Sequence, residues 1–150
     1  MKLTDEIYQR MVSCPQVPPE TGGIIGSSDG EIIDSLIFDF GLSNGNGGVY
    51  IPNVNFINQN IIEWAESGIK FYGIFHTHIL QWSDLSNGDK TYITQILTTM
   101  PSGVNRLYFP LVFPNRNLKC YVAIREDNIV NIINDDIKII KKAREKNEKE

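Results

Sequence analysis

Hydrophobic residues near the start of the chain recur every three or four positions, which predicts a short helix from Thr4 to Met11. A cluster of three prolines after it ends the helix, because proline lacks the backbone N–H that a helix needs. Two apolar runs follow at Gly23–Gly26 and Ile32–Phe40, with a polar, glycine-containing segment between them. This pattern predicts a β-hairpin.

A glycine-rich stretch from Gly41 to Gly48 has no hydrophobic period and is expected to form a loop. The next segment, Val54–Ser67, carries apolar residues on one helical face, and Gly68 is a typical helix terminator. The short β-rich run Ile69–Phe75 then predicts a strand. Helical spacing returns from Gly88 or Asp89 to Met100, which predicts a second long helix.

The remaining apolar segments predict three strands joined by turns, at Arg106–Phe113, Leu118–Arg125 and Asn128–Ile133. A charged helix is expected from about Asp136 to the C-terminus. Alternating helices and strands bury their apolar faces best as layers. We therefore expect one α/β domain over residues 1–150, with a mixed β-sheet flanked by helices.

Composition and charge narrow the class of protein. The 150 residues are 41% hydrophobic and carry a net charge of −4, and the part before residue 141 is the more acidic one. Such a chain has no basic face for nucleic acid and no apolar stretch long enough to span a membrane. Two isolated cysteines, Cys14 and Cys120, do not suggest a disulfide framework, so we expect a cytoplasmic protein.

The two histidines of the chain are His76 and His78, at the end of the predicted strand. Residues two apart in a strand point to the same face, so both imidazoles can ligate one metal ion. Asp89, at the start of the second long helix, is the best third ligand. The alternative is a pair of polar strand-end histidines that bind backbone or solvent.

The residues after the pair favour the metal. Seven residues separate His78 from Ser86, and two more separate Ser86 from Asp89, which gives His-x-His-x7-Ser-x2-Asp. This spacing resembles the JAMM signature of the JAB/MPN zinc metalloprotease family, especially its compact prokaryotic members. The family also has a glutamate before a glycine-containing strand, and Glu20 stands in that place. The resemblance implies an α/β/α sandwich of cytidine-deaminase-like fold.

The resemblance also implies a role for each residue. His76, His78 and Asp89 would hold one Zn²⁺ per chain, with water in the fourth position. Glu20 would act as general base and then as proton donor to the leaving amine. Ser86 would donate a hydrogen bond to the oxyanion, although it is equally suited to be an N-cap of the helix.

The implied reaction is hydrolysis of an isopeptide or peptide bond near the C-terminus of a ubiquitin-like or sulfur-carrier-like protein. Trp82, Gly22 and Gly23 are candidate substrate contacts, and we expect a monomer or dimer. Ile79 and Leu85 replace prolines that are common in the family, so the loop over the cleft differs from the family pattern. Two alternatives are a non-catalytic binding module of the same fold and a zinc hydrolase of a small amide.

Overall fold

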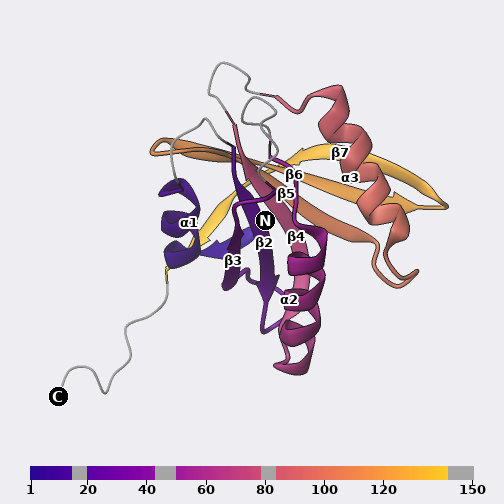
Figure 1. Ribbon diagram of the computed structural model, residues 1–150, viewed down its shortest axis with the longest axis horizontal. Coiled ribbons are helices and arrows are strands. Elements are labelled where there is room, and N and C mark those ends of the chain that lie inside the picture. The colour runs from indigo at the N-terminus through magenta and orange to yellow at the C-terminus, as the bar shows by residue number, and fades with distance from the viewer. Residues whose placement is uncertain (15–19, 43–49, 79–83, 142–150) are drawn as a thin grey trace.

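The computed structural model describes residues 1–14, 20–42, 50–78 and 84–141. Figure 1 shows the helices and strands along the chain. In chain order they are β1 (Lys2–Thr4), α1 (Asp5–Val12), β2 (Gly22–Ser27), β3 (Ser35–Asp39), α2 (Val54–Glu66), β4 (Lys70–Thr77), α3 (Asn87–Thr99), β5 (Arg106–Phe113), β6 (Asn117–Glu126), β7 (Ile129–Asp135) and β8 (Lys138–Ile140). The predicted hairpin, the three predicted helices before residue 101 and the predicted strands are all confirmed within a few residues.

A six-stranded mixed sheet forms the centre of the domain, in the order β3-β2-β4-β5-β6-β7. Strands β4 and β5 run parallel and are joined through α3, whereas the other neighbouring pairs run antiparallel. A small second sheet pairs β1 with β8 in parallel. The predicted class, a single α/β domain with helices packed on a mixed sheet, is therefore confirmed.

Each face of the large sheet has its own hydrophobic core, because successive side chains of a strand point to opposite faces. Ile25 and Phe75 belong to the core beneath α1, whereas their neighbours Ile24 and Ile74 belong to the core beneath α2 and α3. Figure 1 shows α1 on one side of the sheet and α2 and α3 on the other. The result is three layers.

Side chains cap the helices as their sequence suggests. Thr4 accepts a hydrogen bond from the Ile7 N–H at 3.2 Å, and Asn53 accepts one from the Phe56 N–H at 3.2 Å. Gly68 follows α2 with a φ of +79°, a conformation that glycine adopts without strain. The expected helix terminator is therefore confirmed.

The expected C-terminal helix is wrong over the part of it that the structure describes. Residues 138–140 form β8, which pairs with β1 at the other end of the chain. Ile137 and Ile140 fit a helical stripe, but they are β-branched and suit a strand equally well. The partner strand decides between the two, and β1 is too short to be recognised in the sequence.

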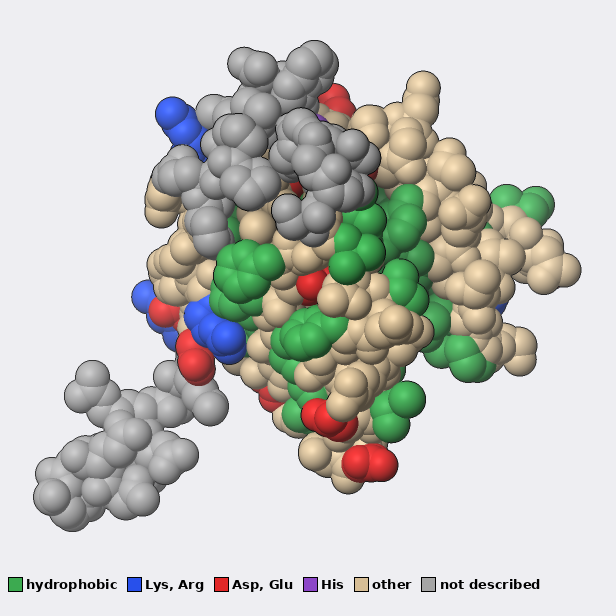
Figure 2. All heavy atoms as spheres, viewed as in Figure 1, with side chains coloured by type: hydrophobic (Ala, Val, Ile, Leu, Met, Phe, Trp, Pro, Cys, Tyr) green, Lys and Arg blue, Asp and Glu red, His purple; other side chains and the backbone are tan. Residues whose placement is uncertain are grey.

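The surface carries hydrophobic side chains around β3 and α2, on the face seen in Figure 2. Four of the large ones are Phe40, Leu42, Val54 and Phe56, between 40% and 69% exposed.

Both cysteines are buried and free. Within the described residues, no helix has the length and apolar character needed to cross a membrane.

Candidate metal centre

Strand β4 presents the two histidines on the face of the sheet that α2 and α3 cover. His76 and His78 alternate with Phe75 and Thr77, which are fully buried. The His78 N–H donates to the Val112 carbonyl of β5 at 2.8 Å, which holds the end of β4 against its parallel neighbour. Sheet hydrogen bonding therefore fixes the backbone beneath both imidazoles.

Asp89 enters the site from the first turn of α3. Its carboxylate accepts the Ser86 N–H, while the Ser86 hydroxyl accepts the Asp89 N–H, each at 3.0 Å. This reciprocal pair is a capping box. Burial alone would raise the pKa of Asp89, but the nearby His76 imidazole and the hydrogen bonds to Ser86 outweigh it and lower that pKa to about 2. The carboxylate is therefore ionised at neutral pH and suited to bind a cation.

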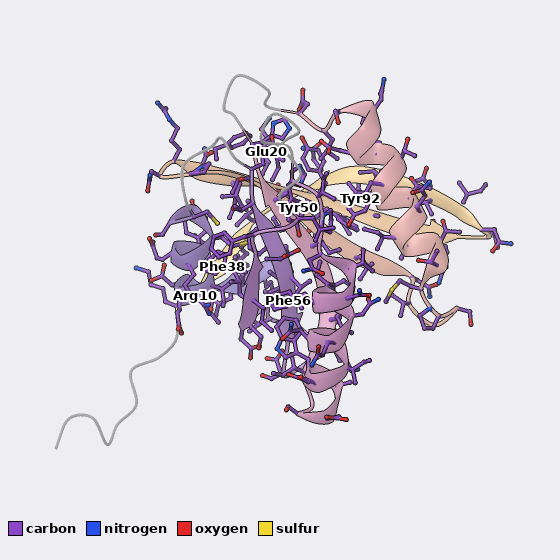
Figure 3. The ribbon with its side chains drawn as sticks, in the orientation of Figure 1. Arg10, Glu20, Phe38, Tyr50, Phe56 and Tyr92 are labelled. Atoms are coloured by element: carbon purple, nitrogen blue, oxygen red, sulfur yellow. The ribbon has the colours of Figure 1, made fainter. Side chains whose placement is uncertain are left out.

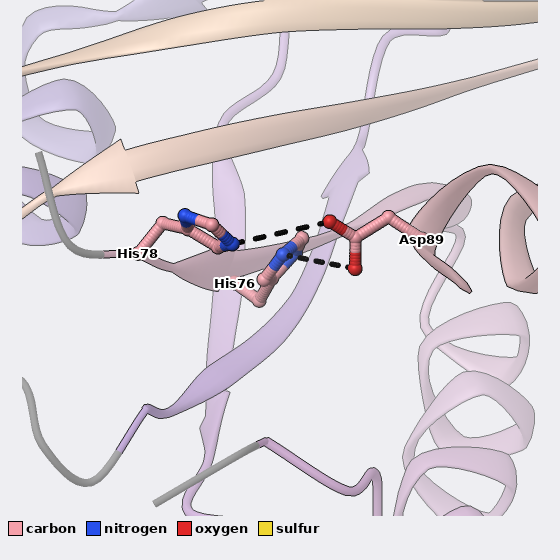
Figure 4. A group of neighbouring side chains, drawn as sticks. All are labelled: His76, His78 and Asp89. Atoms are coloured by element: carbon pink, nitrogen blue, oxygen red, sulfur yellow. Dashed lines mark ion pairs between the residues drawn. The ribbon is translucent and has the colours of Figure 1, made fainter. Parts of the chain in front are cut away.

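The three side chains converge (Figure 4). One ligand atom from each of His76, His78 and Asp89 lies within 4.8 Å of the other two. The two Asp89 oxygens face the two histidines, 3.7 Å from His76 Nε2 and 4.0 Å from His78 Nε2. These separations are too long for hydrogen bonds. They suit a cation held between the three groups.

His76 supplies a test of whether a metal fits. Its Nε2 atom is buried and has no hydrogen-bond partner. A buried polar atom without a partner costs free energy unless something binds it. Two imidazoles and one carboxylate form a common ligand set for zinc that leaves a fourth position for water. The residues present therefore fit a zinc ion.

Glu20 lies close to this group in space, although 55 residues lie between it and His76 in the sequence. Three hydrogen bonds join its neighbour Thr21 to Thr77: to Thr21 O, Thr77 donates its N–H at 2.7 Å and its hydroxyl at 3.3 Å, and Thr21 N–H donates to Thr77 Oγ1 at 2.8 Å. They set Glu20 Oε2 at 3.9 Å from His78 Nε2. The structure thus brings together Glu20, Ser86 and the three candidate ligands.

The other predicted site residues have mixed outcomes. Gly22 and Gly23 are buried in β2, where an added Cβ would lie 2.5 Å from the Phe75 carbonyl oxygen and 2.2 Å from the Ile37 carbonyl oxygen, respectively. Their absent side chains permit close strand packing, and their contact with a substrate stays a prediction. Leu85 is buried in the core beneath α3. Trp82 and Ile79 lie outside the described residues.

Two residues near the site have no signal in the sequence. Tyr50 lies nearly parallel to His76, with ring centroids 6.5 Å apart and an interplanar angle of 10°. Its phenol donates to the buried carboxylate of Asp39 at 2.9 Å. Tyr50 follows the glycine-rich stretch and Asp39 ends a strand, so neither residue belongs to a motif or a hydrophobic period.

No protein-family model matches the sequence, and no curated protein matches it. Its fold is similar to the solution structure of a protein from Desulfitobacterium hafniense, with 17% identity, a TM-score of 0.61, and 97% of this chain and 95% of that chain covered. It is also similar to a protein from Salinibacter ruber, with 16% identity, a TM-score of 0.54, and 93% and 92% covered. At such identities the likeness shows the shared fold alone.

Proposed function

We propose that the protein is a zinc-dependent peptidase or isopeptidase of the JAB/MPN type. The observation that carries this proposal is the convergence of His76, His78 and Asp89, with the Nε2 atom of His76 buried and without a hydrogen-bond partner. A structural cap or a solvated strand end would not leave that atom unsatisfied. The His-x-His-x7-Ser-x2-Asp spacing supports the same reading.

The proposed ligands of the zinc are His76, His78 and Asp89. Zinc supplies Lewis acidity, because it polarises a carbonyl and acidifies water. The sheet and the α3 capping box hold the ligand backbones, so the donor groups are organised before any ion arrives.

Glu20 is the proposed general base. Its Oε1 accepts the Tyr50 N–H at 3.3 Å, while Oε2 faces His78. This orientation leaves Oε2 to take a proton from the attacking water and to return it to the nitrogen of the leaving amine. The carboxylate is about one-fifth exposed, so it lies at the margin of the site within reach of both water and substrate.

Ser86 is the proposed donor to the substrate carbonyl oxygen. Its hydroxyl oxygen accepts the Asp89 N–H, and this leaves the hydroxyl hydrogen to donate. The residue is exposed at the start of α3, beside the proposed zinc ligand Asp89. One serine can thus cap the helix and stabilise developing negative charge.

The proposed substrate is the C-terminal tail of a ubiquitin-like or sulfur-carrier-like protein. The support is the resemblance of the motif, together with the acidic body of the chain, which does not suit nucleic acid. An extended tail suits an open site at the end of a strand.

The experiment joins metal analysis to hydrolysis. We expect about one zinc ion per purified chain by elemental analysis, and its loss in His76→Ala. Glu20→Gln should retain zinc but lower the rate of cleavage of a fluorogenic amide of a peptide ending in Gly-Gly by about 10²–10⁴-fold. Glu31→Gln is the matched control, because Glu31 is an exposed partner of Lys2 away from the site.

Two results would contradict the proposal: a wild-type protein that takes up no zinc, or a Glu20→Gln variant with full activity. A zinc-loaded wild type that binds a ubiquitin-like protein but cleaves neither it nor the peptide would favour the non-catalytic module instead.

A further inference from the structure

Three residues on adjacent strands form a row that ends at the metal centre. Gly22 of β2 pairs with Asp39 of β3 on one side and with His76 of β4 on the other. Directly paired residues of neighbouring strands point to the same face of a sheet. Asp39 and His76 therefore flank a position where Gly22 supplies no side chain.

The ring of Tyr50 occupies this position. Its phenol reaches the Asp39 carboxylate, while its ring lies nearly parallel to the His76 imidazole. A Cβ at Gly22 would lie 2.7 Å from the Tyr50 ring atoms Cε2 and Cζ. The absence of a side chain at residue 22 is thus what admits the ring between Asp39 and His76.

Asp39 fixes the segment that carries Tyr50. The carboxylate is buried and accepts the Gly41 N–H and the Asn53 N–H, each at 2.9 Å, besides the Tyr50 phenol. Burial and the charge of Asp39 raise the pKa of the Tyr50 phenol, so it remains a donor at neutral pH. Asp39 therefore holds the Tyr50 phenol directly and also holds the backbone at Asn53, three residues further on.

The same residue reaches the proposed base. The Tyr50 N–H donates to Glu20 Oε1, and this bond directs Oε2 towards His78. Figure 3 labels Glu20 and Tyr50 in the upper part of the domain, and Tyr92 of α3 interacts electrostatically with the Tyr50 phenol. One residue therefore contacts both a proposed ligand and the proposed base.

We infer that Tyr50, held by Asp39 over Gly22, is a positioning residue that orients His76 for the metal and Glu20 for proton transfer. This inference rests on the proposed function. Tyr50 touches neither the metal ligand atom nor the reacting bond in this role, and it acts through the orientation of its neighbours. Partners of this kind typically change metal affinity by about 10–100-fold when removed.

Two substitutions separate the ring from its hydroxyl. Tyr50→Leu removes the aromatic ring beside His76, whereas Tyr50→Phe keeps the ring and loses only the bond to Asp39. Tyr72→Phe is the matched control, because Tyr72 also donates its phenol, to the Gly30 carbonyl at 2.6 Å, but lies outside the site. Far-UV circular dichroism checks that each variant is folded.

The first readout is metal binding. In competition with a chromophoric chelator, Tyr50→Leu should bind Zn²⁺ at least about 10-fold more weakly than wild type. Tyr50→Phe, which keeps the ring, should retain most of the wild-type affinity. The visible absorption of the Co²⁺-loaded protein should change in Tyr50→Leu and stay unchanged in Tyr72→Phe. Wild-type affinity and an unchanged Co²⁺ spectrum in folded Tyr50→Leu would overturn the inference.

The second readout needs no metal. In the metal-free protein, the NMR signals of the His76 ring protons should shift and broaden in Tyr50→Leu but remain near their wild-type positions in Tyr50→Phe. Identical His76 signals in wild type and Tyr50→Leu would overturn the inference even if zinc binds. A wild type that binds no zinc or cobalt would refute the proposed function, and the His76 signals would still decide whether Tyr50 orients this imidazole.

Discussion

At the scale of single residues, Ser86 and Asp89 combine a structural task with a proposed chemical one. The capping box fixes both the backbone and the side chain of Asp89, because its N–H and its carboxylate each form a hydrogen bond with Ser86. The sequence indicates the cap, since serine before an acidic residue three positions on is a helix-start signature, and the resemblance to the JAMM signature implies the proposed oxyanion role. The structure adds that Asp89, the candidate ligand, is the residue that forms the capping box with Ser86.

Replacing Ser86 by alanine separates these tasks. Loss of the cap should lower the free energy of unfolding by about 1 kcal/mol, measured by urea denaturation of the metal-free protein. Thr4→Ala is the matched control, because Thr4 caps α1 in the same way on the opposite face of the sheet. If Ser86 also stabilises the oxyanion, Ser86→Ala alone should lower peptide cleavage by about 10²-fold or more. Equal rates of peptide cleavage in Ser86→Ala and Thr4→Ala would show that Ser86 acts only as a helix cap.

At the scale of elements, the end of α3 depends on an arginine from another strand. Arg125 of β6 donates from its guanidinium to five backbone carbonyls that close α3 and the turn after it. These carbonyls belong to Leu97, Thr98, Met100, Pro101 and Val104. A cation at a helix C-terminus also complements the helix dipole. Arg125 therefore holds in place the helix that carries Asp89.

Arg125→Ala should destabilise the protein by about 2–3 kcal/mol, because five carbonyls, three of them in part-buried hydrogen bonds, lose a charged donor. Thermal unfolding monitored by circular dichroism measures this change. Arg116→Ala is the control: Arg116 is exposed in the turn between β5 and β6, and its loss should change the free energy of unfolding by less than about 0.5 kcal/mol. Similar effects in both variants would contradict the role of Arg125.

Local sequence patterns predict the longer helices and strands but not the shortest strands. Local pattern predicts α1, α2 and α3, because each buries one face along its own length, and it predicts the longer strands as short β-rich apolar runs bounded by turns. Strands β1 and β8 have three residues each, which is too few to show a period. They form because residues 2–4 and 138–140 meet in space, and this meeting depends on the whole fold.

At the scale of the molecule, the large sheet joins two cores into one unit. Leu3 is fully buried beneath α1, and Leu97 is fully buried on the opposite face. Both cores include side chains of β2, β4, β5 and β6, so neither can come apart without exposing the sheet. We therefore expect a single cooperative unfolding transition.

Leu3→Ala and Leu97→Ala should each lower the free energy of unfolding by about 2–5 kcal/mol. Circular dichroism and tryptophan fluorescence should give coincident urea curves for both variants. Ile62→Ala, at a site that is 60% exposed on α2, should stay within about 0.5 kcal/mol of wild type. Separate transitions for the two probes would show that the two cores unfold independently.

The sequence by itself determines the order of the main elements and the part of the site within one strand-loop-helix unit. His76, His78, Ser86 and Asp89 span 14 residues. Strand alternation and the helix start set how the two histidines and Asp89 point, so their spacing predicts the candidate metal centre.

Only the tertiary structure decides which distant groups join that centre. Glu20 lies at the site because its neighbour Thr21 is hydrogen-bonded to Thr77. Tyr50 lies there because its phenol binds the buried Asp39 carboxylate and its ring fits over Gly22. The end of the described chain becomes a strand because β1 is there to pair with it. Hydrogen bonds between residues far apart in the chain leave no periodic signal, and they form only after the sheet brings their partners together.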